Sequence, residues 1–282
     1  MRIAVSEALH AAEAVPAGTL QPMPIWVVPA EPEAARQRAA WERLWLERRR
    51  GRGGSSGEAE AALAEAPTRA MLALLAQECD AAVLSEADAG WQRAWALLEP
   101  AAPGGVCADL WIAELPGAAT VGWCAWPGTE QLSRAADALA TASATLSQIA
   151  GAPAVPVLLD FSNGRDHSRP QLERLAATLA ARRPGARLVQ IYSPFFFEQG
   201  QLRARNLLAA IGRQVPGTLL LCGPRLHGAE LAAAIEAEGG SWAGPLAAGA
   251  ERPAARLCAQ ATPAQVAATI GRLARLGMGL AG

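Results

Sequence analysis

Short apolar runs alternate with longer amphipathic stretches along most of the chain. The apolar runs have the length of single strands, and the amphipathic stretches repeat hydrophobic residues at helical spacing. The pattern predicts strands over residues 24–28, 81–85, 109–113, 120–125, 155–160, 187–192, 218–222 and 255–258, and helices over residues 33–50, 67–78, 88–98, 129–149, 169–182, 199–213, 228–238 and 263–276. This alternation is typical of βα units around a parallel sheet, so we expect an α/β protein.

The length of the chain favours two lobes over one. At 282 residues and 29.2 kDa it is long for a single compact core. A turn-forming stretch, Gly151-Ala-Pro153, falls where a boundary would divide the strands and helices evenly. We therefore predict two Rossmann-like lobes with parallel sheets flanked by helices, one over residues 1–150 and the other over residues 151–282.

Composition narrows the classes of partner and of chemistry. Hydrophobic residues make up 51% of the chain and charged residues 18%, which argues against disorder. The formal net charge of −1 gives no electrostatic reason to expect nucleic acid or an anionic membrane as partner. The sequence contains no lysine, so neither a Schiff base nor a P-loop can form.

The first residues and the cysteines indicate a cytoplasmic location. Glu7, His10 and Glu13 interrupt any apolar run near the N-terminus, so we expect no signal peptide, and no window has the unbroken apolar length of a membrane span. The 5 cysteines are widely spaced and include no CxxC pair. Such cysteines suit a reducing compartment better than a disulfide framework.

A dense polar loop follows the predicted strand over residues 155–160. Ligands of open α/β sheets bind beyond the carboxyl ends of the strands, and a helix start near Arg169 would point free backbone amides at an anion. His167 beside Asp166 could act as an oriented base, although the same polar residues also suit a helix cap and a solvated turn. Candidate catalytic residues are Arg165, Asp166 and His167, and candidate ligand-binding residues are Asp160, Asn163, Gly164 and Arg169.

A second candidate loop follows the strand over residues 218–222. Gly223 would let a ligand approach the backbone, and Arg225 could hold a phosphate or a carboxylate. His227 either contributes to that site or caps the following helix. Cys222 could act as a nucleophile only if its pKa were lowered, and packing in the core is the alternative.

Several short segments resemble the 2-hydroxyacyl-CoA dehydratase and benzoyl-CoA reductase family, mainly in the first half of the chain. They are Glu7–Gly18, Thr68–Ala76, Cys79–Arg93, Leu110–Pro116, Thr129–Gly151 and, in the second half, Thr218–Gly240. The resemblance implies an iron–sulfur cluster held by cysteines. However, Ala87 stands at one of the cysteine positions of the family, and Glu65-Ala-Pro-Thr68 lacks the other. Because the cluster needs thiolate ligands, we expect no metal and no iron–sulfur cluster.

Three functions follow from these observations. The first is a cluster-free relative or subunit of that family, which binds an acyl-CoA or acts as a binding or assembly partner of another subunit. The second is a metal-free, two-lobed enzyme that acts on a small anionic molecule between its lobes. Such an enzyme would be similar to the uroporphyrinogen-III synthases, because Val157–Tyr192 resembles their order of strand, Gly-Arg loop, helix and strand. The third is an iron–sulfur enzyme with atypical ligands drawn from Cys79, Cys107 and Cys222.

Overall fold

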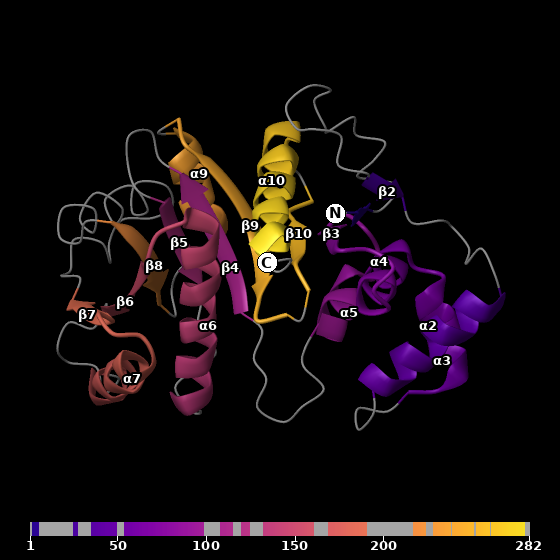
Figure 1. Ribbon diagram of the computed structural model, residues 1–282, viewed down its shortest axis with the longest axis horizontal. Coiled ribbons are helices and arrows are strands. Elements are labelled where there is room, and N and C mark those ends of the chain that lie inside the picture. Colours follow the sequence, from indigo (N-terminus) through magenta and orange to yellow (C-terminus); the bar gives the residue numbers. More distant parts are fainter. Residues whose placement is uncertain are drawn as a thin grey trace. The chain divides into compact units, whose positions relative to one another are not determined.

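The chain is an α/β protein, as predicted, and it divides into two compact units. The computed structural model describes residues 2–5, 25–27, 35–49, 54–98, 108–114, 120–124, 132–160, 169–190, 217–223, 228–237, 239–250, 252–259 and 261–279 (Figure 1). Unit 1 comprises Met1–Cys107 and Pro245–Gly282, and unit 2 comprises Ala108–Gly244. The boundary that the sequence suggests near Gly151 falls inside unit 2.

The strands of unit 1 form a parallel set. β1 (Ile3–Val5) lies between β2 (Ile25–Val27) and β3 (Ala81–Ser85), and β10 (Ala254–Leu257) pairs with the other edge of β3. The residues of β1 and β3 are buried throughout. Strands covered on both faces read as unbroken hydrophobic runs, which explains why β3 lacks a polar alternation.

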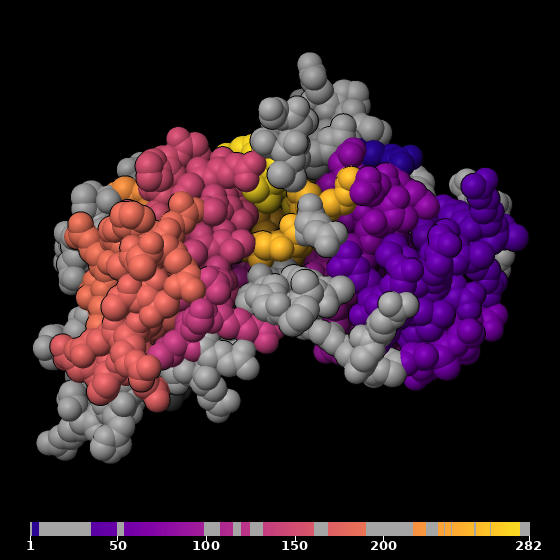
Figure 2. Space-filling model, turned by 60° about the horizontal axis from the view of Figure 1, so that its bottom comes forward, coloured from indigo at the N-terminus to yellow at the C-terminus, as the bar shows by residue number. Residues whose placement is uncertain are grey.

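Helices pack around this sheet and build most of the core of unit 1. They are α2 (Ala35–Arg48), α3 (Ser56–Leu63), α4 (Ala66–Leu75), α5 (Trp91–Trp95), the 3₁₀ turn η1 (Ala96–Leu98) and α10 (Pro263–Gly279). Ser55 and Glu58 form a capping box at the start of α3. Trp41 of α2 is completely buried, and its indole N–H donates to Glu78 Oε1 at 3.1 Å. α2 and α3 form a continuous indigo-to-purple surface in Figure 2.

Unit 2 combines a parallel set of strands with a hairpin. β5 (Thr120–Cys124), β8 (Thr218–Cys222), β6 (Ala154–Asp160) and β7 (Arg187–Gln190) are parallel and adjacent in that order. β4 (Ala108–Glu114) pairs with β5 antiparallel. The connection between β4 and β5 is too short for a helical crossover, so the two strands cannot be parallel.

Helices cover both faces of the sheet in unit 2. Gly122 of β5 lies against Leu146 of α6 (Leu132–Ala150), which places α6 on that face, and α7 (Arg169–Arg182) packs beside α6. Side chains alternate along a strand, so Trp123 points to the opposite face. There, Trp111 stacks on Trp123 and also contacts Trp242 of β9.

Trp242 of β9 (Ser241–Ala248) joins this tryptophan face to α9 (Gly228–Ala237), which precedes β9 along the chain. Trp242 donates its indole N–H to Glu236 Oε1 at 2.9 Å, which joins the start of β9 to the end of α9. β9 pairs antiparallel with β10, again across a short connection. Its residues fall on both sides of the boundary between the units.

Most of the predicted elements are confirmed. Each predicted strand is present, and so is each predicted helix except the one over residues 199–213, which lies outside the described residues. The pattern missed β1, α3 and β9, and it predicted only parallel strands. In the part of the chain that the structure describes, no helix is long and apolar enough to span a membrane.

Candidate functional site

Two neighbouring strands of unit 2 send their connections in opposite directions. β6 continues through α7 to β7 on its outer side, whereas β8 continues through α9 to β9, beyond β5 and β4. In open α/β sheets, ligands bind outside the carboxyl ends of strands at such a switch point. The two loops that the sequence singles out follow β6 and β8, so the fold brings their strand ends together. We call this region, formed by Asp160, Cys222, Gly223 and the starts of α7 and α9, the switch-point site.

The strand ends at this site are fully packed. Asp160, the last residue of β6, is 1% exposed, and Cys222, the last residue of β8, is 0% exposed. Leu158 of β6 is in register with Cys222. Because side chains alternate, Asp160 points to the same face of the sheet as Cys222. The buried side chain of Asp160 therefore lies on the α6 side of the sheet, as the Cys222 thiol does. It is two residues beyond Leu158, the residue of β6 that pairs with Cys222.

Two helices begin beside these strand ends. α7 starts at Arg169 and α9 starts at Gly228. The first backbone N–H groups of a helix have no partner within the helix, and the helix dipole adds partial positive charge, so a helix start favours an anion. Gly223, directly after β8, is buried and carries no side chain that would keep a ligand from the backbone. This arrangement suits a phosphate or carboxylate group.

Cys124 is a residue of this region that the sequence analysis did not single out. It ends β5 and lies in register with Cys222 of β8, and both side chains are 0% exposed. Burial, followed by the contact with the thiol of Cys124, raises the pKa of Cys222 well above its usual range. Cys222 is therefore a protonated, buried thiol, and this state disfavours the nucleophilic role considered from the sequence. The sequence did contain a signal for Cys124, because residues 120–124 and 218–222 are both apolar runs that end in a cysteine.

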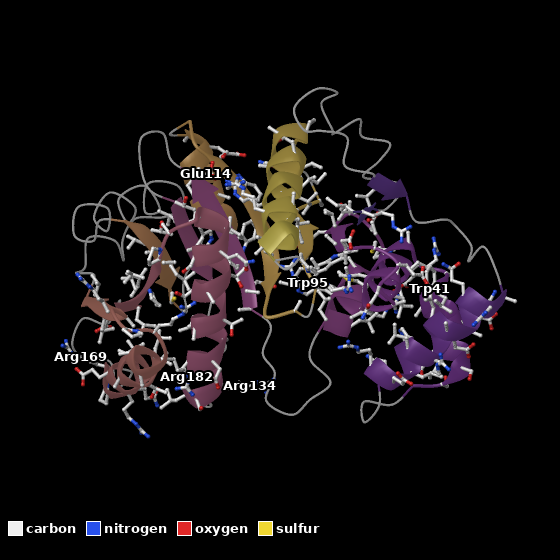
Figure 3. The ribbon with its side chains drawn as sticks, viewed as in Figure 1. Trp41, Trp95, Glu114, Arg134, Arg169 and Arg182 are labelled. Carbon is white, nitrogen blue, oxygen red and sulfur yellow. The ribbon has the colours of Figure 1, made fainter. Side chains whose placement is uncertain are left out.

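The structure describes only part of the predicted site. Asp160, Arg169 and Gly223 are placed as above, and Arg169 lies on the exposed side of α7 with Nε 3.1 Å from Glu173 Oε1 (Figure 3). The other predicted residues lie outside the described ones: Asn163, Gly164, Arg165, Asp166, His167, Arg225 and His227. Their catalytic and binding roles remain predictions.

The strand ends of unit 1 hold a different cluster. Arg256 of β10 contacts Glu86 through Nε at 2.7 Å, and its guanidinium lies over the rings of Trp91 and Trp95, 4.8 and 5.2 Å from their centroids. The cation is thus neutralised by a carboxylate and packed between aromatic rings. This cluster fixes α5 over the end of β3, and its contacts are those of a structural tie.

Metal ligands do not gather among the described residues. No group of three or more His, Cys, Asp or Glu side chains in those parts of the chain could hold a metal ion. Cys79 precedes β3 in unit 1, and its burial raises the pKa of its thiol to about 12. Ala87, at the position of a cluster cysteine in the dehydratase resemblance, is an exposed loop residue whose N–H donates to Ser85 Oγ at 3.1 Å.

Comparison with known proteins identifies similar folds and no sequence family. No family model matches the chain, and no curated protein matches it. Solved structures do: EutD phosphotransacetylase from Staphylococcus aureus matches with 15% identity and a TM-score of 0.65, over 98% of this chain and 94% of that one. A phosphotransacetylase from Streptococcus pyogenes matches with 13% identity and a TM-score of 0.67, over 99% and 94%.

A third match is a branched-chain phosphotransacylase from Enterococcus faecalis V583, with 11% identity and a TM-score of 0.58 over 98% of this chain and 99% of that one. At these identities the likeness establishes the fold. The matches cover nearly the whole chain, so the likeness extends over both units.

These findings correct the functional expectations from the sequence. The resemblance to the 2-hydroxyacyl-CoA dehydratase and benzoyl-CoA reductase family is wrong, because the similar folds are phosphotransacylases. The predicted cluster-free subunit of that family, the uroporphyrinogen-III-synthase-like enzyme and the iron–sulfur enzyme with atypical ligands are wrong for the same reason. The segments that carried the resemblance include α4, β3, β4 and α6, which are βα elements common to many α/β folds.

Proposed function

We propose that the chain is a phosphotransacylase-like protein, which binds an acyl donor and a phosphate at the switch-point site and transfers the acyl group between them. The observation that carries the proposal is the full-length likeness to phosphotransacetylase folds, which spans both units. The acyl carrier that we propose is coenzyme A, in line with the acyl-CoA partner considered from the sequence.

The geometry of the switch-point site supports the phosphate half of this reaction. α7 follows β6 and α9 follows β8, and the first backbone N–H groups of a helix have no partner within the helix, so both helix starts suit an anion. The chain has no lysine, so arginine must supply the positive charge. Arg165 and Arg225, in the loops after these strands, are the arginines that we propose for phosphate binding, because a guanidinium binds phosphate with two parallel hydrogen bonds.

The proposed reaction is an acyl transfer without a covalent enzyme intermediate. A phosphate oxygen attacks the thioester carbonyl, the oxyanion is stabilised by N–H donors, and the thiolate leaves and takes up a proton. We propose His167, oriented by Asp166, as the group that moves this proton. Cys222 is not assigned a chemical step, because its thiol is buried and its pKa is raised.

Phosphate-dependent cleavage of thioesters tests the proposal. Purified protein is mixed with acetyl-CoA, propionyl-CoA or isobutyryl-CoA, and the released thiol is followed with and without inorganic phosphate. We expect release that requires phosphate, and the reverse reaction should form a thioester from acetyl phosphate and CoA. Cleavage that is independent of phosphate would indicate a thioesterase. No cleavage together with no calorimetric binding of acetyl phosphate or acyl-CoA would contradict the proposal.

Variants in the loops then test the residues. Arg225→Gln and Arg165→Gln should each raise the KM for phosphate by about 10–100-fold, the loss of one charge-assisted contact. His167→Gln should lower kcat with a smaller effect on the KM for phosphate. Arg174→Gln is the matched control, because Arg174 is an exposed residue of α7. An equal effect of the control variant would mean that the loss is not specific to the site.

A further inference from the structure

Cys124 and Cys222 lie opposite each other on neighbouring parallel strands. β5 and β8 pair with these two residues in register, and both side chains are completely buried. Neighbouring strands are roughly 4.8 Å apart, and disulfides bridge Cα atoms about 4.4–6.8 Å apart. The backbone spacing of the two residues therefore matches that of a disulfide.

The two thiols also face each other. Side chains alternate along a strand, so Trp123 and Leu221 point to one face and the two cysteines to the other. The thiol of Cys124 helps to raise the pKa of Cys222, and the Cys222 thiol donates to the carbonyl oxygen of Leu220 at 3.5 Å. Neither thiol forms a disulfide here. The pair is a reduced, buried dithiol in register on two neighbouring strands.

The other thiols of the described residues lack such a partner. Cys79 and Cys258 belong to unit 1 and lie outside its strands. Cys258 is partly exposed and follows β10 directly. It therefore serves as an internal reference for a cysteine that has no second cysteine across the sheet.

We propose that Cys124 and Cys222 form an oxidative modification site, at which a small peroxide converts the dithiol into a disulfide that joins β5 to β8. One thiolate attacks a peroxide oxygen, the O–O bond breaks, and the cysteine becomes a sulfenic acid while water leaves. The second sulfur then attacks the sulfenic sulfur, and its proton leaves with the hydroxyl as water. Two thiols and one hydrogen peroxide thus give one disulfide and two waters.

This inference does not rest on the proposed acyl transfer, and its readout is independent of any activity. Burial and the Cys124 thiol raise the pKa of Cys222, so the reactive thiolate is scarce at neutral pH. We expect oxidation to be slow near pH 7 and to accelerate as the pH rises. The bridge would fix the ends of the two strands beside the switch-point site.

Peptide mapping after oxidation tests the proposal. Cleavage after arginine leaves Cys124 in the peptide over residues 94–134 and Cys222 in the peptide over residues 214–225. Cys107 lies in the first peptide as well, so the experiment uses the Cys107→Ser variant. In the unaltered chain, fragmentation of the joined peptides in the mass spectrometer distinguishes a bridge at Cys124 from one at Cys107. The folded protein is treated with hydrogen peroxide, free thiols are alkylated, and the digest is analysed before and after reduction.

We expect the two peptides to be joined, with a mass lower than their sum by two hydrogen atoms, and to separate on reduction. Cys124→Ser and Cys222→Ser should each abolish the joined peptide, and Cys258→Ser should leave it unchanged. The midpoint of thermal unfolding should rise after oxidation and return after reduction. Alkylation of both cysteines after peroxide treatment, or sulfinic acid without a joined peptide, would overturn the proposal.

Discussion

Gly122 of β5 lies so close to Leu146 of α6 that no larger residue fits between them. A Cβ on Gly122 would stand 2.6 Å from Leu146 Cδ2 and 3.3 Å from Leu110 Cδ1. Both leucines are completely buried, so neither can turn into solvent. Glycine thus sets the distance between α6 and the strand that ends in Cys124.

Gly122→Ala should therefore lower the free energy of unfolding by about 1–3 kcal/mol, the usual cost of overpacking a core. Gly271→Ala is the control, because Gly271 lies within α10 and a Cβ there meets nothing within 4 Å. The free energy of unfolding of this control should rise by about 0.5–1 kcal/mol, because alanine has a higher helix propensity than glycine. Urea unfolding measures both, and Leu146→Ala combined with Gly122→Ala should lose less than the two single losses added together. Equal stability of Gly122→Ala and the unaltered chain would contradict the packing argument.

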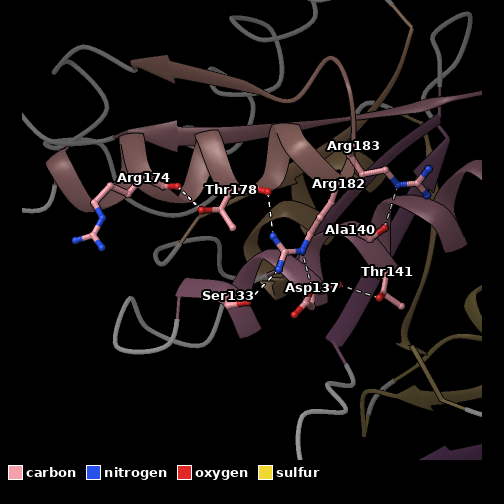
Figure 4. A network of polar contacts seen from close by, with 8 residues as sticks. All are labelled: Ser133, Asp137, Ala140, Thr141, Arg174, Thr178, Arg182 and Arg183. Atoms are coloured by element: carbon pink, nitrogen blue, oxygen red, sulfur yellow. Dashed lines mark hydrogen bonds and ion pairs between the residues drawn. The ribbon is translucent and has the colours of Figure 1, made fainter.

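Arg182 ties α7 to α6 through two hydrogen bonds and makes a third within α7 (Figure 4). Nε donates to Asp137 Oδ1 at 2.5 Å, one terminal nitrogen donates to Ser133 Oγ at 3.0 Å, and the other donates to the carbonyl oxygen of Thr178 at 3.1 Å. The Arg182 and Asp137 side chains are 31% and 50% exposed, so water and salt weaken their attraction.

Arg182→Gln should lower the free energy of unfolding by about 0.5–1 kcal/mol, and the loss should shrink in high salt. Arg174→Gln, on the exposed part of the same helix, should change it by less than about 0.5 kcal/mol. Chemical unfolding at low and high sodium chloride provides the measurement. A loss that stays the same in both salts would mean that packing of the arginine stem, and not its charge, joins the helices.

Hydrophobic periodicity predicted most of the helices and strands, and it missed β1 and β9 for physical reasons. β1 has only three residues, Ile3–Val5, too few for a period to show, and its neighbours β2 and β3 determine its place in the sheet. β9 contains Gly244 followed by Pro245, a pair that is typical of turns. Gly244 has a φ of 116°, which a residue with a side chain rarely adopts, so the strand continues through a bend that only glycine permits there.

The sequence pointed to the two loops of the proposed site, but it did not show which strands pair beside them. Polar loops after Asp160 and Cys222 were visible, and the topology makes their two strands neighbours. Which strands pair depends on long-range contacts that local patterns do not encode, so the matching ends of residues 120–124 and 218–222 did not by themselves align Cys124 with Cys222. The mistaken dehydratase resemblance had the same origin, because alanine-rich helices and short strands match many α/β proteins in local sequence.

Arg256 should contribute more to stability than the exposed ion pair on α5 in the same unit. Its side chain is 14% exposed and contacts Glu86 and the rings of Trp91 and Trp95. Arg256→Ala should lower the free energy of unfolding by about 1–3 kcal/mol, because a largely buried ion pair and two ring contacts are lost. Arg256→Lys should recover only part of this loss, because an ammonium cannot stack as a planar guanidinium does.

The control for Arg256 is Arg93→Ala. Arg93 pairs with Glu65, but its side chain is 67% exposed, so the expected loss is below about 1 kcal/mol. Urea unfolding of the three variants gives the comparison. If Arg93→Ala cost as much as Arg256→Ala, enclosure by the two tryptophans would not be the source of the difference.

The buried thiols should make the protein lose stability in alkali. Burial raises the pKa of Cys79 from 9.0 to about 12 and also raises the pKa values of Cys222 and Cys258. In the unfolded chain these thiols ionise near pH 9, whereas in the folded chain they keep their protons. Above pH 9 the unfolded state therefore binds fewer protons, and the free energy of unfolding falls as the pH rises, by up to about 1.4 kcal/mol per pH unit for each thiol.

The composition of the chain makes this effect measurable. There is no lysine and there is 1 tyrosine, so few other groups titrate between pH 9 and pH 12. Urea unfolding at pH 8, 9, 10 and 11 measures the free energy of unfolding. The thiols should hardly change it below pH 9, and it should fall steadily above pH 9. Cys79→Ala should flatten the alkaline slope by about the contribution of one thiol, whatever its effect at pH 8. An unchanged slope in Cys79→Ala would show that Cys79 ionises equally readily in the folded and unfolded chains, contrary to its burial beside β3.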